Sequence, residues 1–369
     1  MNYQKRLKRL QEVLKEASCD ALLIDNLINL YYMTGIELSA GTLLVHTDGA
    51  LLLVDSRYIE NCRKISPFPV KQSDSINMDS LLASPELAFI KKLAFDSQST
   101  SYKDYLALQK MAASASEKKA AELVLVPFDS PVEKLRTIKD AEEITILQEA
   151  ADLGTKGFNL VCSLLQTGIT ELEAATELEI FWKRLGSKGV AFEPIIAFGK
   201  NSSMPHYRAG RTLLQPGDIV LVDIGVNYHH YHSDMTRIVF FGKPDPQLLA
   251  IHGIVKQAQQ AALALCRPGI TLGDLDSAAR NLISSKGYGS SFTHSLGHGV
   301  GLEIHEYPGV KSSPPYRNVP LSPGMVITIE PGIYLPDVGG IRIEDTVVIT
   351  ENGHENLTKI SPEPLFIGE

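Results

Sequence analysis

The sequence predicts an α+β catalytic part preceded by a smaller α/β part, and three observations indicate this. Short strand and helix patterns alternate up to residue 129. A polar segment with two prolines, residues 127–140, then marks a boundary. Beyond it, long helical patterns alternate with strand hairpins, and one hairpin pattern occurs twice. We therefore expect domains at residues 1–130 and 131–369.

The composition sets the class of protein. The chain has 369 residues, 44% hydrophobic and 21% charged, with a formal charge of −8. This balance is typical of a folded globular protein, and long basic blocks suited to nucleic acid do not occur. Four scattered cysteines without C-x-x-C spacing favour free thiols in a reducing compartment. Since neither an apolar run of ~18 residues nor a signal-peptide pattern is found, we expect a cytoplasmic protein without membrane or nucleic-acid partners.

The first part begins with an amphipathic helix, because apolar residues recur at intervals of three and four over residues 7–14. Residues 21–25 follow as a short strand. Residues 42–55 are predicted to form a hairpin whose tight turn is Asp48-Gly49.

The second part opens with a helix signal. Asp140, with Glu143 three positions later, forms the capping-box pattern. Apolar periodicity predicts four long helices, at residues 141–166, 171–188, 246–266 and 272–287. Hairpin patterns lie between and after these helices, which is an α+β order.

An internal repeat lies in this second part. Residues 213–225 and 320–332 align at a constant offset of 107, each with a Pro-Gly turn, an apolar strand and a trailing glycine. A second pair of strands follows at an offset of 110. The repeat places a carboxylate at corresponding positions of each strand: Asp223 and Glu330 on the first, Asp234 and Glu344 on the second. We expect a duplicated hairpin unit with pseudo-twofold symmetry.

The spacing of the four acids predicts their geometry. Asp223 and Asp234 are symmetric about the centre of their loop, and in a regular hairpin they would lie directly opposite each other. Glu330 and Glu344 are likewise symmetric, about Asp337. Both hairpins should therefore present paired carboxylates on one face.

The acids of the first hairpin should be buried, because its strands are apolar on both faces. Buried like charges must be neutralised by protons, arginines or metal ions. Arg237 and Arg342 are available, but two single charges do not balance four acids. Two ordinary acid–arginine pairs are the alternative to a metal site.

A histidine- and glycine-rich segment completes the candidate site. Residues 293–306 hold His294, His298 and His305 among three glycines, which allow close approach of the backbone and argue against a helical zinc site. Two Asp, two Glu and one His form an oxygen-rich ligand set that suits two carboxylate-bridged divalent ions. Such ions activate water and polarise a carbonyl, so the set points to hydrolysis.

With these motifs in order, the second part resembles the pita-bread metallopeptidases, the family of methionine aminopeptidase, prolidase and aminopeptidase P. The first part resembles the creatinase-type N-terminal domain of the proline-directed members. The resemblance rests on five segments: NSSMPHY (201–207), VDIGVNYHHYHSDMTR (222–237), HSLGHGVGLEIHE (294–306), TIEPGIY (328–334) and GGIRIEDT (339–346). It implies the pita-bread (creatinase/aminopeptidase) fold.

The resemblance also implies roles for individual residues. It gives five metal ligands, Asp223, Asp234, His298, Glu330 and Glu344, of which Glu330 also handles the proton of the attacking water. It assigns His206 and His305 to the oxyanion, and His294, Tyr334 and Arg342 to substrate binding. Two divalent ions per chain are implied, with Mn²⁺ favoured and Co²⁺, Fe²⁺ or Zn²⁺ as alternatives. A homodimer is expected from the resemblance alone.

The expected function is that of an Xaa-Pro aminopeptidase, which hydrolyses the N-terminal Xaa-Pro bond of peptides with proline at the second position through a metal-bridging hydroxide. An Xaa-Pro dipeptidase is the alternative, and the loop 305–320, with Lys311 and Arg317 as carboxylate-binding candidates, is where the two should differ. A metal-free peptide-binding module on the same fold is a third interpretation. A methionine aminopeptidase is disfavoured by the extra N-terminal domain.

Overall fold

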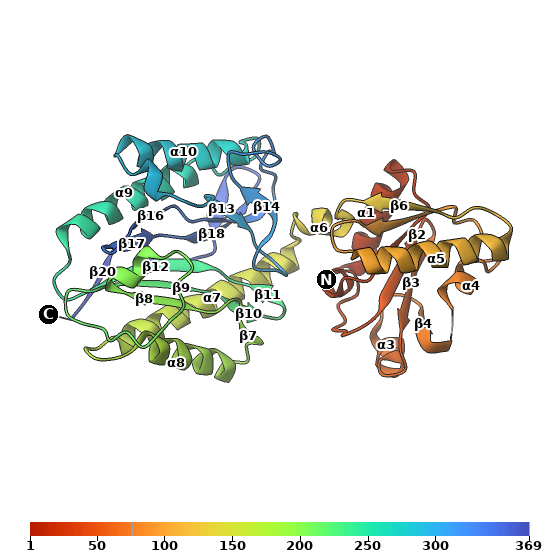
Figure 1. The fold of residues 1–369 in the computed structure, drawn as a ribbon, viewed down its shortest axis with the longest axis horizontal. Coiled ribbons are helices and arrows are strands. Elements are labelled where there is room, and N and C mark those ends of the chain that lie inside the picture. The colour runs from red at the N-terminus through yellow and green to blue at the C-terminus, as the bar shows by residue number, and fades with distance from the viewer. Residues whose placement is uncertain (76, 369) are drawn as a thin grey trace. The chain divides into compact units, whose positions relative to one another are not determined.

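The computed structural model describes residues 1–75 and 77–368 (Figure 1). The chain divides into two compact units, Met1–Arg136 and Thr137–Glu369. The boundary expected after residue 130 lies a few residues before this division, and the last residue of the expected second domain, 369, is outside the described part. None of the described helices is long and apolar enough to cross a membrane.

The first unit is an α/β domain whose strands are β1 (Ala21–Ile24), β2 (Thr42–His46), β3 (Gly49–Val54), β4 (Val70–Gln72), β5 (Lys92–Asp96) and β6 (Val124–Phe128). They form one sheet of order β4-β3-β2-β1-β5-β6, in which β1, β5 and β6 are parallel. The helices are α1 (Tyr3–Glu16), α2 (Leu27–Thr34), α3 (Ile59–Ile65), α4 (Met78–Leu82), α5 (Tyr102–Lys119) and α6 (Pro131–Arg136), with the 3-10 turn η1 (Ser73–Ser75). The hairpin predicted at 42–55 is confirmed. Its predicted turn is wrong by one position, because His46 pairs with Gly49 and leaves Thr47 and Asp48 as the turn.

The second unit contains the four predicted helices, now bounded as α7 (Ala141–Leu164), α8 (Glu171–Arg184), α9 (Pro246–Leu263) and α10 (Leu272–Ser285), with 3-10 turns η2 (Gly199–Ser203) and η3 (Gly289–Ser291). The capping box of Asp140 and Glu143 begins α7 as predicted. Two further capping boxes begin α8 and α10.

The strands of the second unit are β7 (Gly189–Val190), β8 (Ile195–Phe198), β9 (Ile219–Ile224), β10 (Val226–Tyr228), β11 (Tyr231–His232), β12 (Met235–Phe241), β13 (Gly297–Gly299), β14 (Glu306–Val310), β15 (Val326–Ile329), β16 (Gly332–Leu335), β17 (Gly339–Arg342), β18 (Asp345–Ile349), β19 (His354–Asn356) and β20 (Leu365–Ile367). They form four sheets: β11-β10-β7, β20-β12-β9-β8, β14-β13-β15-β18-β19 and β16-β17. An isolated bridge between Thr236 and Glu344 connects the two larger sheets.

Both faces of the β9–β12 hairpin are covered by helices, as its apolar pattern predicts (Figure 1). Leu221 and Phe240 belong to a core cluster that includes residues of α9 and α10. Val220 and Val239 belong to another cluster, with residues of α7 and α8. A carboxylate on these strands is therefore removed from bulk water.

The internal repeat is visible in the backbone. Gly217 and Gly324, the glycines of the two Pro-Gly turns, both adopt the left-handed region, with φ of +98° and +85°. The turns lead into β9 and β15, which occupy corresponding positions of the repeat. The partner strands β12 and β18 correspond in the same way.

The predicted register is right for one hairpin and wrong for the other. In the second, Ile329 pairs with Asp345 and Gly332 with Arg342, so Glu330 and Glu344 lie at facing positions as expected. In the first, Asp223 pairs with Thr236 instead of Asp234.

The tip of the first hairpin explains the error. Tyr228 pairs with Tyr231, so His229 and His230 form the turn, with φ of +48° and +70°. This places the centre of the hairpin one position later than the symmetry of the two aspartates implies. Asp234 shares the face of Asp223 but lies diagonal to it.

Candidate active site

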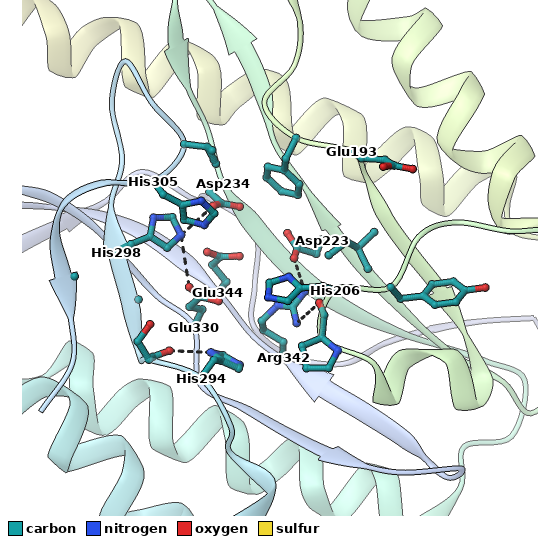
Figure 2. Close-up of a pocket in the computed structure, with 18 of the residues that line it drawn as sticks. Glu193, His206, Asp223, Asp234, His294, His298, His305, Glu330, Arg342 and Glu344 are labelled. Carbon is teal, nitrogen blue, oxygen red and sulfur yellow. Dashed lines mark hydrogen bonds and ion pairs between the residues drawn. The ribbon is translucent and has the colours of Figure 1, made fainter. Parts of the chain in front are cut away.

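A cavity of about 550 Å³ opens over the two repeated hairpins (Figure 2). Its walls come from three parts of the chain: the hairpin carboxylates, the segment 192–208 and the segment 294–316. Nine of the ten site residues predicted from the sequence line it: His206, Asp223, Asp234, His294, His298, His305, Glu330, Arg342 and Glu344. The tenth, Tyr334, lies behind this wall, in hydrogen-bond contact with His294 and Arg342.

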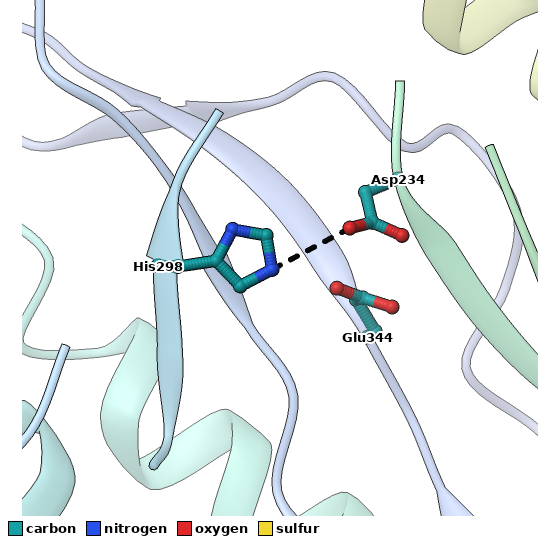
Figure 3. Close-up of side chains that lie close together, drawn as sticks. All are labelled: Asp234, His298 and Glu344. Atoms are coloured by element: carbon teal, nitrogen blue, oxygen red, sulfur yellow. Dashed lines mark ion pairs between the residues drawn. The ribbon is translucent and has the colours of Figure 1, made fainter. Parts of the chain in front are cut away.

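Three side chains at the centre converge as metal ligands would. Asp234, His298 and Glu344 each offer one ligand atom, and these atoms all lie within 4.8 Å of one another (Figure 3). Asp234 directly precedes β12, His298 lies on β13, and Glu344 directly precedes β18. The His298 Nε2 is 3.5 Å from an Asp234 oxygen and 3.6 Å from a Glu330 oxygen.

The orientation of His298 is fixed by the backbone. Its Nδ1 lies 3.0 Å from the Gly299 carbonyl, which can only accept, so Nδ1 carries the proton. Burial lowers the pKa of His298 to about 4, and the imidazole is neutral at pH 7. The lone pair of Nε2 therefore faces carboxylate oxygens, which are also acceptors. A cation between these groups satisfies both.

The carboxylates show the same need for a cation. Burial, and then the charge of Glu344, raise the pKa of both Asp234 and Glu330 well above its ordinary value. Burial and Asp223 raise the pKa of Glu344 to about 8. Asp223 Oδ1 is buried without a hydrogen-bond partner among the described residues. An unpartnered carboxylate oxygen beside three destabilised acids fits a ligand set for divalent ions.

Arg342 supplies one positive charge at the edge of this cluster. It forms an ion pair with the second oxygen of Asp223 and donates to the hydroxyls of Tyr334, at 2.7 Å, and Thr236, at 3.2 Å. The Tyr334 hydroxyl in turn lies 2.9 Å from His294 Nε2. Because His294 Nδ1 must donate to the Ser295 carbonyl, Nε2 accepts from Tyr334. A chain of donors thus orients His294.

Arg237, the other arginine considered from the sequence, pairs elsewhere. Its Nη2 lies 2.5 Å from Asp345, and its remaining N–H groups donate to backbone carbonyls, including those of Thr236 and Glu344. It connects β12 to β18 beneath the cluster. Simple acid–arginine pairing therefore leaves most of the four carboxylates unneutralised.

His206 and His305 both line the cavity beside the carboxylates, His206 near Asp223 and Arg342 and His305 near Asp234 and His298 (Figure 2). His305 stacks edge-on against His298, with ring centroids 4.2 Å apart. His206 follows η2, which is held to β17 by a hydrogen bond from the Gly340 N–H to the Ser202 hydroxyl. Burial lowers the pKa of His305, which favours its neutral form at pH 7.

One supporting residue, Glu171, was not identified from the sequence. Glu171, fully buried at the start of α8, accepts hydrogen bonds from the Asn201 amide, the Tyr207 hydroxyl and the backbone N–H of Gly210. It holds the loop that carries His206. In the sequence Glu171 was indistinguishable from an ordinary acid in a first helical turn.

Besides Arg342, two cationic side chains line the cavity, Lys311 and Arg208. Lys311 lines it, with Nζ 4.9 Å from the centroid of the Tyr316 ring. Arg208 and Glu193, which form an ion pair, also line the cavity. Arg317, the other carboxylate-binding candidate, is exposed and is not part of the lining.

Comparison with known proteins covers both units. The sequence pattern of metallopeptidase family M24 matches residues 145–351, and that of the creatinase/prolidase N-terminal domain matches residues 6–138. An Xaa-Pro dipeptidase of Pyrococcus horikoshii is 39% identical, over 97% of this chain and 98% of its own. The structure of an Xaa-Pro dipeptidase from Bacillus anthracis superposes with a TM-score of 0.90 at 35% identity, covering 99% and 100% of the two chains. That of an X-Pro aminopeptidase from Thermotoga maritima gives 0.83 at 33% identity, covering 95% and 98%.

Proposed function

Because this chain belongs to metallopeptidase family M24 and carries a creatinase/prolidase N-terminal domain, we propose that it is a dinuclear metal-dependent Xaa-Pro dipeptidase. The sequence motifs favoured an Xaa-Pro aminopeptidase, but the relatives favour the dipeptidase. The two Xaa-Pro dipeptidases compared above have higher sequence identity to this chain than the X-Pro aminopeptidase from Thermotoga maritima. The aminopeptidase is the second candidate, supported by the Thermotoga maritima structure.

The observation that carries the choice is the position of Lys311. A dipeptide ends in a carboxylate directly after proline, so a dipeptidase needs a cation on the cavity wall beyond the proline site. Lys311 is a half-buried cation that lines the cavity, and we propose that it binds this carboxylate. An aminopeptidase, whose substrate continues beyond proline, needs an open groove there.

Asp223, Asp234, His298, Glu330 and Glu344 would hold the two ions, for which we propose Mn²⁺. When bound, the ions would supply Lewis acidity and a water of lowered pKa. The neutral Nε2 of His298 and the unpartnered Oδ1 of Asp223 are the ligand atoms that the described structure leaves most in need of such a partner.

Side chains of the cavity would transfer the proton, stabilise the oxyanion and bind the proline ring. Glu330, with its raised pKa, would take the proton of the attacking water and return it to the departing proline nitrogen. His206 and His305 would donate to the developing oxyanion of the scissile carbonyl. His294, held by Tyr334 and Arg342, would pack against the proline ring.

The test is the release of free alanine from Ala-Pro and from Ala-Pro-Ala by Mn²⁺-loaded protein. We expect rapid hydrolysis of Ala-Pro and little of Ala-Pro-Ala. Efficient hydrolysis of the tripeptide alone would establish the aminopeptidase instead. Hydrolysis of neither, with metal bound, would contradict both.

One lysine variant and one arginine variant test whether Lys311 binds the substrate carboxylate. K311M should raise KM for Ala-Pro about 10- to 100-fold, the effect of losing one charge-assisted hydrogen bond. R317M removes a cation from the same loop but outside the cavity, and should leave KM unchanged. Equal effects of the two would show that only the overall charge of the loop matters.

A further inference from the structure

An ion pair with a buried carboxylate, outside the carboxylate cluster, connects two stretches of the chain at the cavity. Asp276 and Arg280 lie one turn apart on α10, and their contact is bidentate, at 2.7 and 3.0 Å. The Asp276 side chain is 1% exposed and that of Arg280 is 32% exposed. Burial acts to raise the pKa of Asp276, but the hydrogen bonds from Arg280 and Ser312 outweigh it and the pKa is lowered, so the pair is ionised at pH 7.

The pair holds the backbone of two separate segments. The Asp276 carboxylate accepts from the Leu296 N–H, at 3.2 Å, and from the Ser312 N–H, at 3.3 Å. Arg280 donates to the carbonyls of Phe292, at 3.1 Å, and His294, at 2.8 Å. Four backbone groups, from residues 292–296 and from residue 312, therefore depend on one ion pair.

These two segments carry groups with different tasks in the proposed reaction. Residues 292–296 include His294, the proposed proline-binding side chain. They also reach the catalytic carboxylate, because the Leu296 carbonyl accepts from the Glu330 N–H at 2.8 Å. Ser312 directly follows Lys311, the proposed anchor for the substrate carboxylate. The Asp276 carboxylate thus links the backbone beside His294 to the backbone beside Lys311.

A role confined to helix stability does not account for these contacts. The start of α10 is already closed by the capping box of Thr271 and Asp274. An i,i+4 pair that served only the helix would face solvent and would leave its remaining donors and acceptors to water. Here they bond to backbone groups behind the cavity wall.

We propose that the Asp276–Arg280 pair is a positioning element that fixes the spacing between His294 and Lys311, and through it the preference for a substrate that ends at proline. This inference rests on the proposed dipeptidase function. The pair does not touch the substrate; it acts through the two segments that do.

The experiment compares Ala-Pro with Ala-prolinamide, which has the same scissile bond but no carboxylate. R280M removes the donors and keeps Asp276 bonded to both backbone N–H groups, whereas D276N removes the charge but keeps the size of the side chain. Each should lower the ratio of kcat/KM for Ala-Pro to that for Ala-prolinamide about tenfold, mainly through KM for Ala-Pro. R280K, which keeps the charge, should retain part of the preference.

D274N is the matched control, because it changes an aspartate of the same helix that bonds to Thr271 and not to the cavity wall. It should leave the substrate ratio within about twofold of wild type, whatever it does to thermal stability. If D276N fails to fold, R280M tests the proposal by itself, because Arg280 is the more exposed residue of the pair.

A double-mutant cycle with K311M gives the decisive readout. If the pair acts by placing Lys311, R280M should change the substrate ratio in the wild-type background and have no further effect on it in the K311M background. An unchanged ratio in R280M and D276N, in a wild type that prefers Ala-Pro, would overturn the inference and leave the proposed function intact. A wild type without preference for Ala-Pro would overturn the proposed function first.

Discussion

Replacing Arg237 tests how much its buried ion pair with Asp345 contributes to the stability of the second unit. Its side chain is 2% exposed, and its N–H groups reach Asp345, Thr236, Glu344 and two carbonyls of the segment 360–361. In R237M the Asp345 carboxylate, 3% exposed, would keep one contact, the Asn356 amide at 2.9 Å. Removing one partner of a buried pair costs about 3–5 kcal/mol. We expect R237M to lower the free energy of unfolding by about 4 kcal/mol.

The loss of stability can be measured by tryptophan fluorescence, which reports on the second unit alone because the chain has a single tryptophan. Trp182 lies on α8, fully buried, with its indole N–H bonded to the Leu153 carbonyl. Its fluorescence during denaturant unfolding of metal-free protein therefore reports the transition of this unit. Since a domain of this size shifts by about 2–4 °C per kcal/mol, the midpoint of thermal unfolding should fall by about 10 °C.

Two further variants control the interpretation. R237M/D345N also removes the buried negative charge and should recover about half of the loss. K256M breaks the partly exposed pair with Glu363 and should cost less than about 1 kcal/mol. A loss below about 1 kcal/mol in R237M, or no recovery in the double variant, would refute the reasoning that a buried uncompensated charge dominates.

Three more predictions concern the site and its pH dependence. E330Q should retain metal, measured by elemental analysis, and lose at least about 100-fold in kcat on Ala-Pro, because no group then carries the water proton; near-full activity would contradict this assignment. Burial lowers the pKa of His252 to about 4, so the unfolded state binds the proton first as pH falls below about 6.5; stability should drop on the order of 3 kcal/mol by pH 4, and H252Q should lose less over the same range in denaturant titrations. Burial raises the pKa of Glu344 to about 8, so metal-free protein should lose stability as pH rises from about 4.5 to 8, and Mn²⁺ should raise the midpoint of thermal unfolding more at pH 8 than at pH 6; a constant shift would count against carboxylate ligands.

The sequence predicts those parts of the fold that depend on local pattern. The four long helices and the capping box at Asp140 follow from apolar periodicity and side-chain capping, which act within a few residues. The duplicated hairpins follow from the Pro-Gly turns, whose left-handed glycines are needed in both copies. The facing positions of Glu330 and Glu344 follow from the regular second hairpin.

The sequence does not predict features that depend on the conformation of a single turn or on partners far away in the chain. The His229-His230 turn shifts the first hairpin, and two histidines with positive φ are not a pattern that a sequence signals. The partners of Glu171, Asp276 and Arg237 are separated from them by many residues and come together only in the folded chain. The expected homodimer stays a prediction.

Ala-Pro hydrolysis during titration of metal-free protein with Mn²⁺ tests most directly whether the five ligands hold two catalytic ions. Bound metal per chain and the rate of alanine release are measured at each addition. We expect no hydrolysis without metal and a rate that reaches its plateau when two ions are bound per chain. Hydrolysis that persists in metal-free protein, or a plateau that bears no relation to bound metal, would contradict it.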